Sequence, residues 1–161
     1  MWKQRLIETS RGCFEIFISG SGEALCVTHL YSEFNERGYY FADAFTENFT
    51  VYLVNLKEAG HSCKADTAAE LSMTETAMDL EAIRIALGLE QWGFAGHSTG
   101  GMLGLVYAIL FQDSISKLMI GGAAASRRYM EHEGSMYCPK NPLNRRLKEI
   151  FAILDSPGAT F

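Results

Sequence analysis

The chain has 161 residues, of which 14 are Lys or Arg and 19 are Asp or Glu, so its formal net charge is -5. With 48% hydrophobic residues, a chain of this length can bury a core without disulfides or a structural metal. The acidic balance argues against nucleic-acid binding, because affinity for nucleic acids depends largely on clustered cations that neutralise phosphates. The four cysteines lack C-x-x-C spacing, so neither a zinc site nor a disulfide framework is indicated, and we expect no cofactor.

The N-terminal segment reaches Glu8 and Arg11 before any long apolar run, which is not the pattern of a signal peptide. The longest stretch without charged residues runs from Gln91 to Gln112. Its first half is rich in glycine and polar residues, so we interpret it as part of a core and not as a membrane span. We therefore expect a cytoplasmic protein with reduced thiols that does not bind membranes.

The first part of the chain contains three short apolar segments separated by turn residues. They predict strands over Arg5 to Thr9, Cys13 to Ser19 and Ala24 to His29. Gly20-Ser21-Gly22 lacks the third glycine of a dinucleotide-binding fingerprint and is typical of a hairpin turn. Together these segments predict an antiparallel meander.

Helix and strand patterns alternate along the next part of the chain. A helix over Thr74 to Leu87 is the best supported, because Ser72 and Glu75 form a capping box and Gly88 follows its end. Such alternation predicts an α/β fold with a parallel sheet covered by helices on both faces. The other predicted elements are a helix near Gly38 to Glu47, a strand over Thr50 to Asn55, a strand over Trp92 to Ala95, a helix over Gly100 to Phe111 and a strand over Lys117 to Gly121.

The composition changes near Arg127. The three prolines, Pro139, Pro142 and Pro157, all lie beyond this point, and basic residues outnumber acidic ones there. We therefore divide the chain into an ordered body, residues 1–126, and a different C-terminal segment, residues 127–161.

The pattern G-x-S-x-G occurs at residues 96–100, between a short apolar strand and an apolar helix. A serine on such a tight turn needs neighbours without side chains, because the chain before and after it passes at close range. The start of the helix adds free backbone N–H groups and a partial positive charge, both of which suit a developing oxyanion. Ser98 is therefore the candidate nucleophile.

On these residues the chain resembles the α/β-hydrolase superfamily, in particular esterases, lipases and enzymes related to proline iminopeptidases. The resemblance covers roughly residues 5–126 and implies the α/β-hydrolase fold, a mostly parallel sheet with helices on both faces, of which about six of eight strands are present. It implies that residues 1–126 are the N-terminal part of the hydrolase core and that residues 127–161 begin a cap or lid. It also implies that the backbone N–H groups of Thr99 and Tyr31 bind the oxyanion. The matching stretches are Val27-Thr28-His29, Thr50 to Ser62, Leu87-Gly88-Leu89-Glu90 and Gly96 to Gly101.

The chain also departs from the family's pattern at two loops. Where the family has His-Gly, this chain has His29-Leu30. Where it has Asp-Leu-Arg-Gly-x-Gly-x-Ser, residues 55–62 read Asn-Leu-Lys-Glu-Ala-Gly-His-Ser. Leu30 is therefore expected to alter the backbone of the oxyanion loop.

A serine nucleophile needs a histidine base and usually a carboxylate, which in this family follow the serine along the chain. His132 is the only histidine after Ser98, and its place between two glutamates is more typical of a cap residue than of a base. Asp113 lies at the far end of the predicted helix, too distant to orient an imidazole at the site. His61 is a substitute candidate, since its loop can approach the site.

The resemblance therefore implies a truncated, inactive or weakly active fragment of a serine hydrolase that acts on a carboxylic ester or small amide. The turn at residues 96–100, between strand and helix, is called the elbow. A serine at the centre of the elbow argues against dehalogenases and epoxide hydrolases, which use an aspartate there. The strand Lys117 to Gly121 would be an open sheet edge, so we expect a homo-oligomer that forms through it. The alternative is a non-catalytic, hydrolase-like binding protein, which the changes at Leu30 and Asn55 favour.

Overall fold

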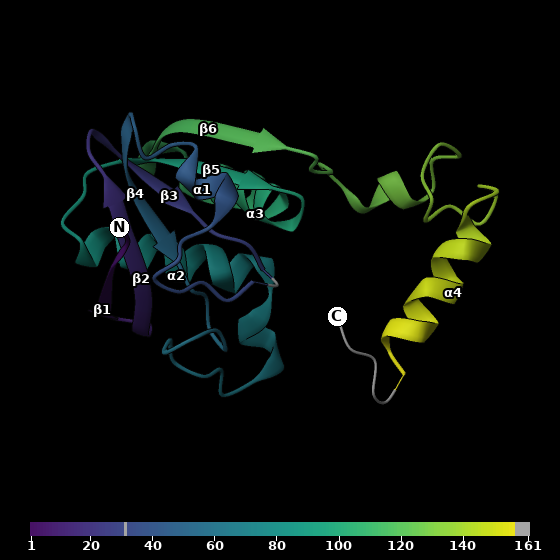
Figure 1. The fold of residues 1–161 in the computed structure, drawn as a ribbon, viewed down its shortest axis with the longest axis horizontal. Coiled ribbons are helices and arrows are strands. Elements are labelled where there is room, and N and C mark those ends of the chain that lie inside the picture. Colours follow the sequence, from purple (N-terminus) through teal and green to yellow (C-terminus); the bar gives the residue numbers. More distant parts are fainter. Residues whose placement is uncertain (31, 157–161) are drawn as a thin grey trace. The chain divides into compact units, whose positions relative to one another are not determined.

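The computed structural model describes residues 1–30 and 32–156. It divides into two compact units, Met1–Ala123 and Ala124–Phe161, and each is described by itself. The first unit contains one six-stranded sheet with its helices (Figure 1). Its elements are β1 (Lys3–Thr9), β2 (Gly12–Gly20), β3 (Glu23–Val27), α1 (Tyr40–Asp43), β4 (Phe49–Val54), the 3-10 helix η1 (Ala68–Leu71), α2 (Met73–Ala86), β5 (Trp92–His97), α3 (Thr99–Leu110), the 3-10 helix η2 (Gln112–Ser114) and β6 (Ile115–Gly121).

The strands of the sheet lie in the order β1-β2-β4-β3-β5-β6. Strand β3 is parallel to its neighbours β4 and β5, and β5 is parallel to β6, whereas β1 and β2 are antiparallel additions at one side. The prediction of a mostly parallel sheet is confirmed.

The predicted meander is wrong beyond its first hairpin. Strand β2 pairs with β4, so β4 lies between β2 and β3 and the two strands joined by Gly20-Ser21-Gly22 are not neighbours. The turn therefore is not a hairpin turn. Its glycines are needed because β4 enters beside them: a Cβ on Gly20 would lie 2.2 Å from the Phe49 carbonyl oxygen.

Alternate side chains of the strands enter two apolar clusters on opposite faces of the sheet. On β4, Val54 belongs to the cluster formed with α2 and α3, whereas Val51 and Leu53 belong to the cluster formed with α1. Both faces are therefore covered by helices (Figure 1).

The helix after β4 follows the sequence pattern closely. Ser72 Oγ accepts a hydrogen bond from the Glu75 backbone N–H at 3.3 Å, which is the predicted capping bond. At the other end, Gly88 has a φ of +70°, the left-handed conformation that a glycine adopts at little cost. The predicted helix over Thr74 to Leu87 is therefore confirmed to within one residue at each end.

The helix predicted near Gly38 to Glu47 is much shorter, and covers only Tyr40–Asp43. The backbone N–H groups of Phe45 and Thr46 bond to carbonyl oxygens three residues back, at 3.1 and 3.2 Å, so the chain tightens into turns as it approaches β4.

The second unit contains the 3-10 helix η3 (Arg127–Met130) and helix α4 (Asn144–Leu154), which was not among the predicted elements. Tyr137 packs between η3 and α4. The centroid of its ring lies 5.6 Å from that of Tyr129 and 6.4 Å from that of Phe151. No helix within the described residues is both long and apolar enough to cross a membrane.

Candidate active site

Ser98 occupies the turn between β5 and α3, with φ 52° and ψ -124°. Few residues other than glycine adopt a positive φ, so the backbone here is strained. The surrounding glycines have no room for side chains: a Cβ on Gly96 would lie 2.6 Å from the Gly100 carbonyl oxygen, and one on Gly100 would lie 2.4 Å from that of Thr28. The G-x-S-x-G pattern therefore forms the sharp turn expected from the sequence.

The turn is anchored through its backbone, which leaves the serine hydroxyl exposed. The Ser98 N–H donates to the Gly121 carbonyl at 3.0 Å, and the Ser98 carbonyl accepts from the Met102 N–H at 3.0 Å. Across residues 1–30 and 32–156, no side chain hydrogen-bonds to Ser98 Oγ. The hydroxyl therefore faces solvent beside the start of α3, where helix N–H groups are free.

Of the two residues expected to bind an oxyanion, Thr99 is the first residue of α3, so its N–H has no acceptor within the helix. Tyr31 lies outside the described residues, and its role stays a prediction.

His29 links the loop after β3 to the elbow. Its Nδ1 lies 3.2 Å from Ser32 Oγ and its Nε2 lies 3.1 Å from Thr99 Oγ1. Burial, together with the neighbouring His97, lowers the pKa of His29. A neutral imidazole suits this place, because it can donate to one hydroxyl and accept from the other. His29 therefore positions the residue that follows the nucleophile.

His97 belongs to an aromatic cluster on the α1 side. Its Nε2 hydrogen-bonds to the Tyr39 hydroxyl and lies 3.3 Å from that of Tyr40. Burial, and secondarily Tyr40, raises the pKa of Tyr39 to about 12, so this phenol keeps its proton. The hydrogen-bond partners of His97 are thus these tyrosines and not Ser98.

His61 is bonded to a buried carboxylate that the sequence patterns did not reveal. Its Nδ1 lies 2.7 Å from Glu15 Oε1, while the imidazole itself stays largely exposed. Although burial opposes ionisation of Glu15, hydrogen bonds from the His61 backbone and side chain, Gln4 and Asn55 lower its pKa. His61 therefore holds its loop against β2 and is not paired with Ser98.

Asn55 has a physical reason to replace the family's aspartate. Its Nδ2 donates to Glu15 Oε2 at 2.7 Å and to the Phe34 carbonyl at 3.0 Å, while its Oδ1 accepts from the Phe34 N–H at 2.8 Å. An aspartate would place a second carboxylate against Glu15 and lose both donated bonds. Glu15 and Asn55 thus form a hydrogen-bonded pair. The two residues are far apart in the sequence, so the pair is recognised only in the folded structure.

The second unit contains the remaining base candidate. His132 is exposed, and its Nδ1 accepts the Gly134 N–H at 3.1 Å. The Asp113 carbonyl accepts from Gln91, which lies just before β5, so this carboxylate is at the opposite end of β5 from Ser98, as expected. Within the described part of the chain, none of the histidines is hydrogen-bonded to the candidate nucleophile.

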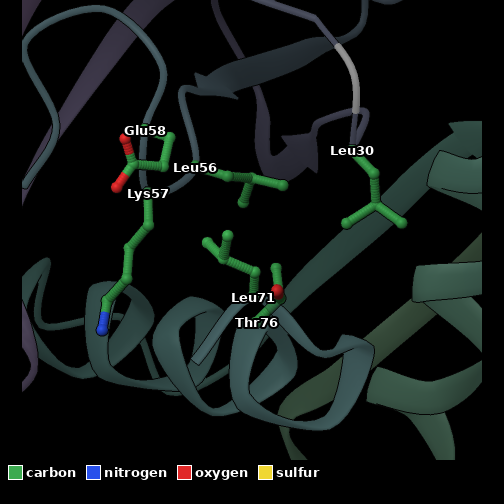
Figure 2. Close-up of a pocket in the computed structure, with 6 residues that line it drawn as sticks. All are labelled: Leu30, Leu56, Lys57, Glu58, Leu71 and Thr76. Atoms are coloured by element: carbon green, nitrogen blue, oxygen red, sulfur yellow. The ribbon is translucent and has the colours of Figure 1, made fainter. Parts of the chain in front are cut away.

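A cavity of about 260 Å³ lies beside the loops that follow β3 and β4 (Figure 2). Among the described residues, no group of three or more His, Cys, Asp or Glu side chains is arranged to hold a metal ion. The cavity is lined by Leu30, Leu56, Lys57, Glu58, Leu71 and Thr76.

Comparison with known proteins adds a family context. A family model described as alpha/beta hydrolase fold matches residues 18–142. The structure of an alpha/beta fold family hydrolase from Bacillus anthracis is 52% identical and superimposes with a TM-score of 0.95, over 99% of this chain and 58% of that one. An epoxide hydrolase from an endophytic Streptomyces is 20% identical, with a TM-score of 0.64 over 74% of this chain and 36% of that one.

A curated relative from Caulobacter segnis carries the name carbamate hydrolase RutD. It is 31% identical over 77 residues, which make up 48% of this chain and 29% of RutD. The chain thus spans less than two thirds of the length of each of these relatives.

Proposed function

Because the chain belongs to the alpha/beta hydrolase fold family, we propose that it carries the nucleophile of a serine hydrolase that cleaves carboxylic esters or small amides. The observation that supports this most strongly is the strained, exposed serine at residue 98, held at the start of α3 between glycines that have no room for a Cβ. Strain of this kind is concentrated at functional sites, where the surrounding structure maintains it.

In the proposed reaction, Ser98 Oγ attacks the carbonyl carbon of the substrate while a histidine base takes its proton. The Thr99 N–H stabilises the negative charge that develops on the carbonyl oxygen. Collapse of the tetrahedral intermediate breaks the bond to the alcohol or amine, which leaves with the proton from the base. Water then attacks the acyl-enzyme by the same route and releases the carboxylic acid.

We propose that the base and its carboxylate come from sequence beyond residue 161 in a longer protein, so that this chain alone is weakly active. Two observations support this: the Bacillus anthracis relative is much longer, and Ser98 has no imidazole partner among the described residues. His132 is the alternative base within the chain.

The serine at residue 98 also helps to decide which relative's type of reaction this chain is expected to share. Epoxide hydrolases share the fold with this chain at low identity, but their chemistry uses a carboxylate at the elbow, which forms an ester with the opened epoxide that water can hydrolyse. A serine would form an ether with the opened epoxide, and an ether has no carbonyl for water to attack. A carbamate, which RutD is named for, contains a carbonyl that a serine can attack. Acyl transfer to water is therefore the better supported reaction.

The alternative, a non-catalytic binding protein, is favoured by one observation: His29, His61 and His97 are all bonded to other groups. Such a protein would keep the fold and the elbow but would not activate the serine. Reactivity of Ser98 distinguishes the two functions.

Labelling with a fluorophosphonate, followed by intact-mass measurement, tests the proposal on the 161-residue chain. We expect slow labelling that added imidazole accelerates at least about ten-fold, since free imidazole can replace a missing general base. Ser98→Ala should abolish the adduct. Ser21→Ala is the matched control, because Ser21 is also exposed and flanked by glycines, and it should leave labelling unchanged.

Two outcomes would contradict this account. Fast, stoichiometric labelling without imidazole would show that the chain contains its own base, and His132→Ala would then identify it. No labelling of the folded chain at any imidazole concentration would reject the serine hydrolase and favour the binding protein.

We also propose a cytoplasmic location. The support is that Cys13, Cys26, Cys63 and Cys138 are all free thiols, as is usual in a reducing compartment.

A further inference from the structure

The cavity beside the loops after β3 and β4 has mainly apolar walls. Leu30, Leu56 and Leu71 contribute side chains to it from the first loop, the second loop and η1 (Figure 2). Leu56 is buried, whereas Leu71 is 47% exposed and forms the outer wall. The space is therefore an apolar recess that is accessible from solvent.

Two of its lining residues, Leu30 and Glu58, stand where the family's pattern has glycine. Glu58 has a φ of 72°, a left-handed conformation that is strained for a residue other than glycine. Both changes add side-chain walls at the same cavity. The cavity is therefore a feature in which this chain differs from the general pattern.

The polar groups around the cavity already have partners. Lys57 Nζ lies 2.6 Å from Glu70 Oε2 and 3.9 Å from Asp79 Oδ2. Glu58 accepts from the Ala65 N–H at 2.8 Å. Thr76 Oγ1 donates to the Ser72 carbonyl at 2.9 Å. A ligand would therefore find apolar surface and no unpaired charge, which favours an uncharged aliphatic group.

The cavity lies at the same sheet edge as Ser98. Strands β3, β4 and β5 are parallel, so the loops that follow them meet at one edge, and β3 is the direct neighbour of β5. Leu30 follows His29, whose Nε2 lies 3.1 Å from the hydroxyl of Thr99, the residue after the nucleophile. The residue before Leu30 thus contacts the residue after Ser98, so the cavity and the candidate nucleophile lie at neighbouring loops of the same sheet edge.

We infer that this cavity binds the aliphatic acyl chain of the ester that acylates Ser98. The inference rests on the proposed serine hydrolase and names its substrate class: esters with an uncharged aliphatic acyl chain. Burial of the chain against the leucines would supply affinity by removing apolar surface from water.

Binding of 1-octanol to the 161-residue chain, measured by methyl NMR, tests the inference without any turnover. We expect saturable shifts of the Leu30, Leu56 and Leu71 methyl signals. Leu71→Lys should weaken binding about ten-fold, since loss of one leucine contact is worth roughly 1 to 1.5 kcal/mol. Leu110→Lys is the matched control, because Leu110 is also 47% exposed but lies at the far end of α3, and it should leave the affinity unchanged.

The same titration on Ser98→Ala separates this inference from the proposed function, because octanol binding needs no nucleophile. Binding to Ser98→Ala at unchanged affinity, with no fluorophosphonate labelling of the native chain, would leave the cavity intact and reject the hydrolase. Labelling of Ser98 without saturable shifts at the three leucines would overturn the cavity as the acyl site. Equal weakening by the substitutions at residues 71 and 110 would also overturn it.

Discussion

At the scale of single residues, the elbow depends on the absence of side chains. A Cβ on Gly100 would lie 2.4 Å from the Thr28 carbonyl oxygen, which belongs to backbone and cannot move away cheaply. Gly100→Ala should therefore lower the free energy of unfolding by about 2 kcal/mol, as overpacking usually does. Urea denaturation would measure the loss.

Gly121→Ala provides the control for this prediction. No atom lies within 4 Å of a Cβ added there, and Gly121 has no positive φ. Its effect should stay within about 0.5 kcal/mol. Equal destabilisation by the two substitutions would show that close approach is not what requires glycine at residue 100.

Sequence patterns located Ser98 because its motif is local: a few adjacent residues determine the turn. Glu15 could not be found in this way. Its partners, Asn55 and His61, lie 40 and 46 residues away, and a single glutamate in an apolar strand does not indicate what it contacts. Long-range polar pairing becomes visible only when the strands are placed.

At the scale of elements, the bond between His61 and Glu15 attaches the loop after β4 to strand β2. The hydrogen bond that His61 donates to the Glu15 carboxylate raises the pKa of His61 above 6.5, so this contribution to stability is complete below about pH 6.5 and is lost as pH rises through the raised value. The pKa of Glu15 is lowered from 4.5, so its contribution is present above about pH 4.5 and is lost in stronger acid.

His61→Gln should therefore destabilise the chain more at about pH 5.5 than at about pH 9, because only the lower pH keeps the imidazole charged. Thermal unfolding at both pH values would measure this difference. His132→Gln, at an exposed histidine whose ring accepts a backbone N–H, is the matched control and should change the unfolding temperature little at either pH. A pH-independent effect of His61→Gln would mean that the pair acts only as a neutral hydrogen bond.

Periodicity predicted the type of each element of the sheet but not the partner of each strand. The segments from Cys13 to Ser19 and from Ala24 to His29 correspond to β2 and β3, although β3 ends two residues earlier than predicted, at Val27, and β4 separates the two strands. Adjacency in sequence favours a hairpin, whereas the parallel pairing of β3 with β4 and β5 buries Leu25, Cys26 and Val27 completely. Burial of the central strand decided the topology.

At the scale of the whole molecule, the two edges of the sheet differ in how they are protected. Strand β1 exposes Lys3, Arg5 and Glu8 together with Leu6, whereas β6 exposes one charged residue, Lys117, together with Leu118 and Ile120, at 36% and 41%. Within the described residues, β6 pairs with β5 alone. An apolar edge with unpaired backbone groups favours pairing with a second copy, whereas charged residues protect an edge from it.

We expect the chain to form a homo-oligomer through β6, detectable by sedimentation velocity. Replacing Leu118 and Ile120 together with lysine should shift it to the monomer, while Leu6→Lys on β1 should not. A native chain that sediments as a single monomer at all concentrations would contradict this expectation.

The position of β3 has a consequence for the order in which the chain can fold during synthesis. Its two neighbours, β4 and β5, both follow it in the sequence, so Glu23–Val27 leaves the ribosome without either partner. The hairpin of β1 and β2 can form at once, but the centre of the sheet must wait until His97 has been translated. Until then the chain presents an unpaired apolar strand, and such segments are prone to aggregation and are typical sites of chaperone binding.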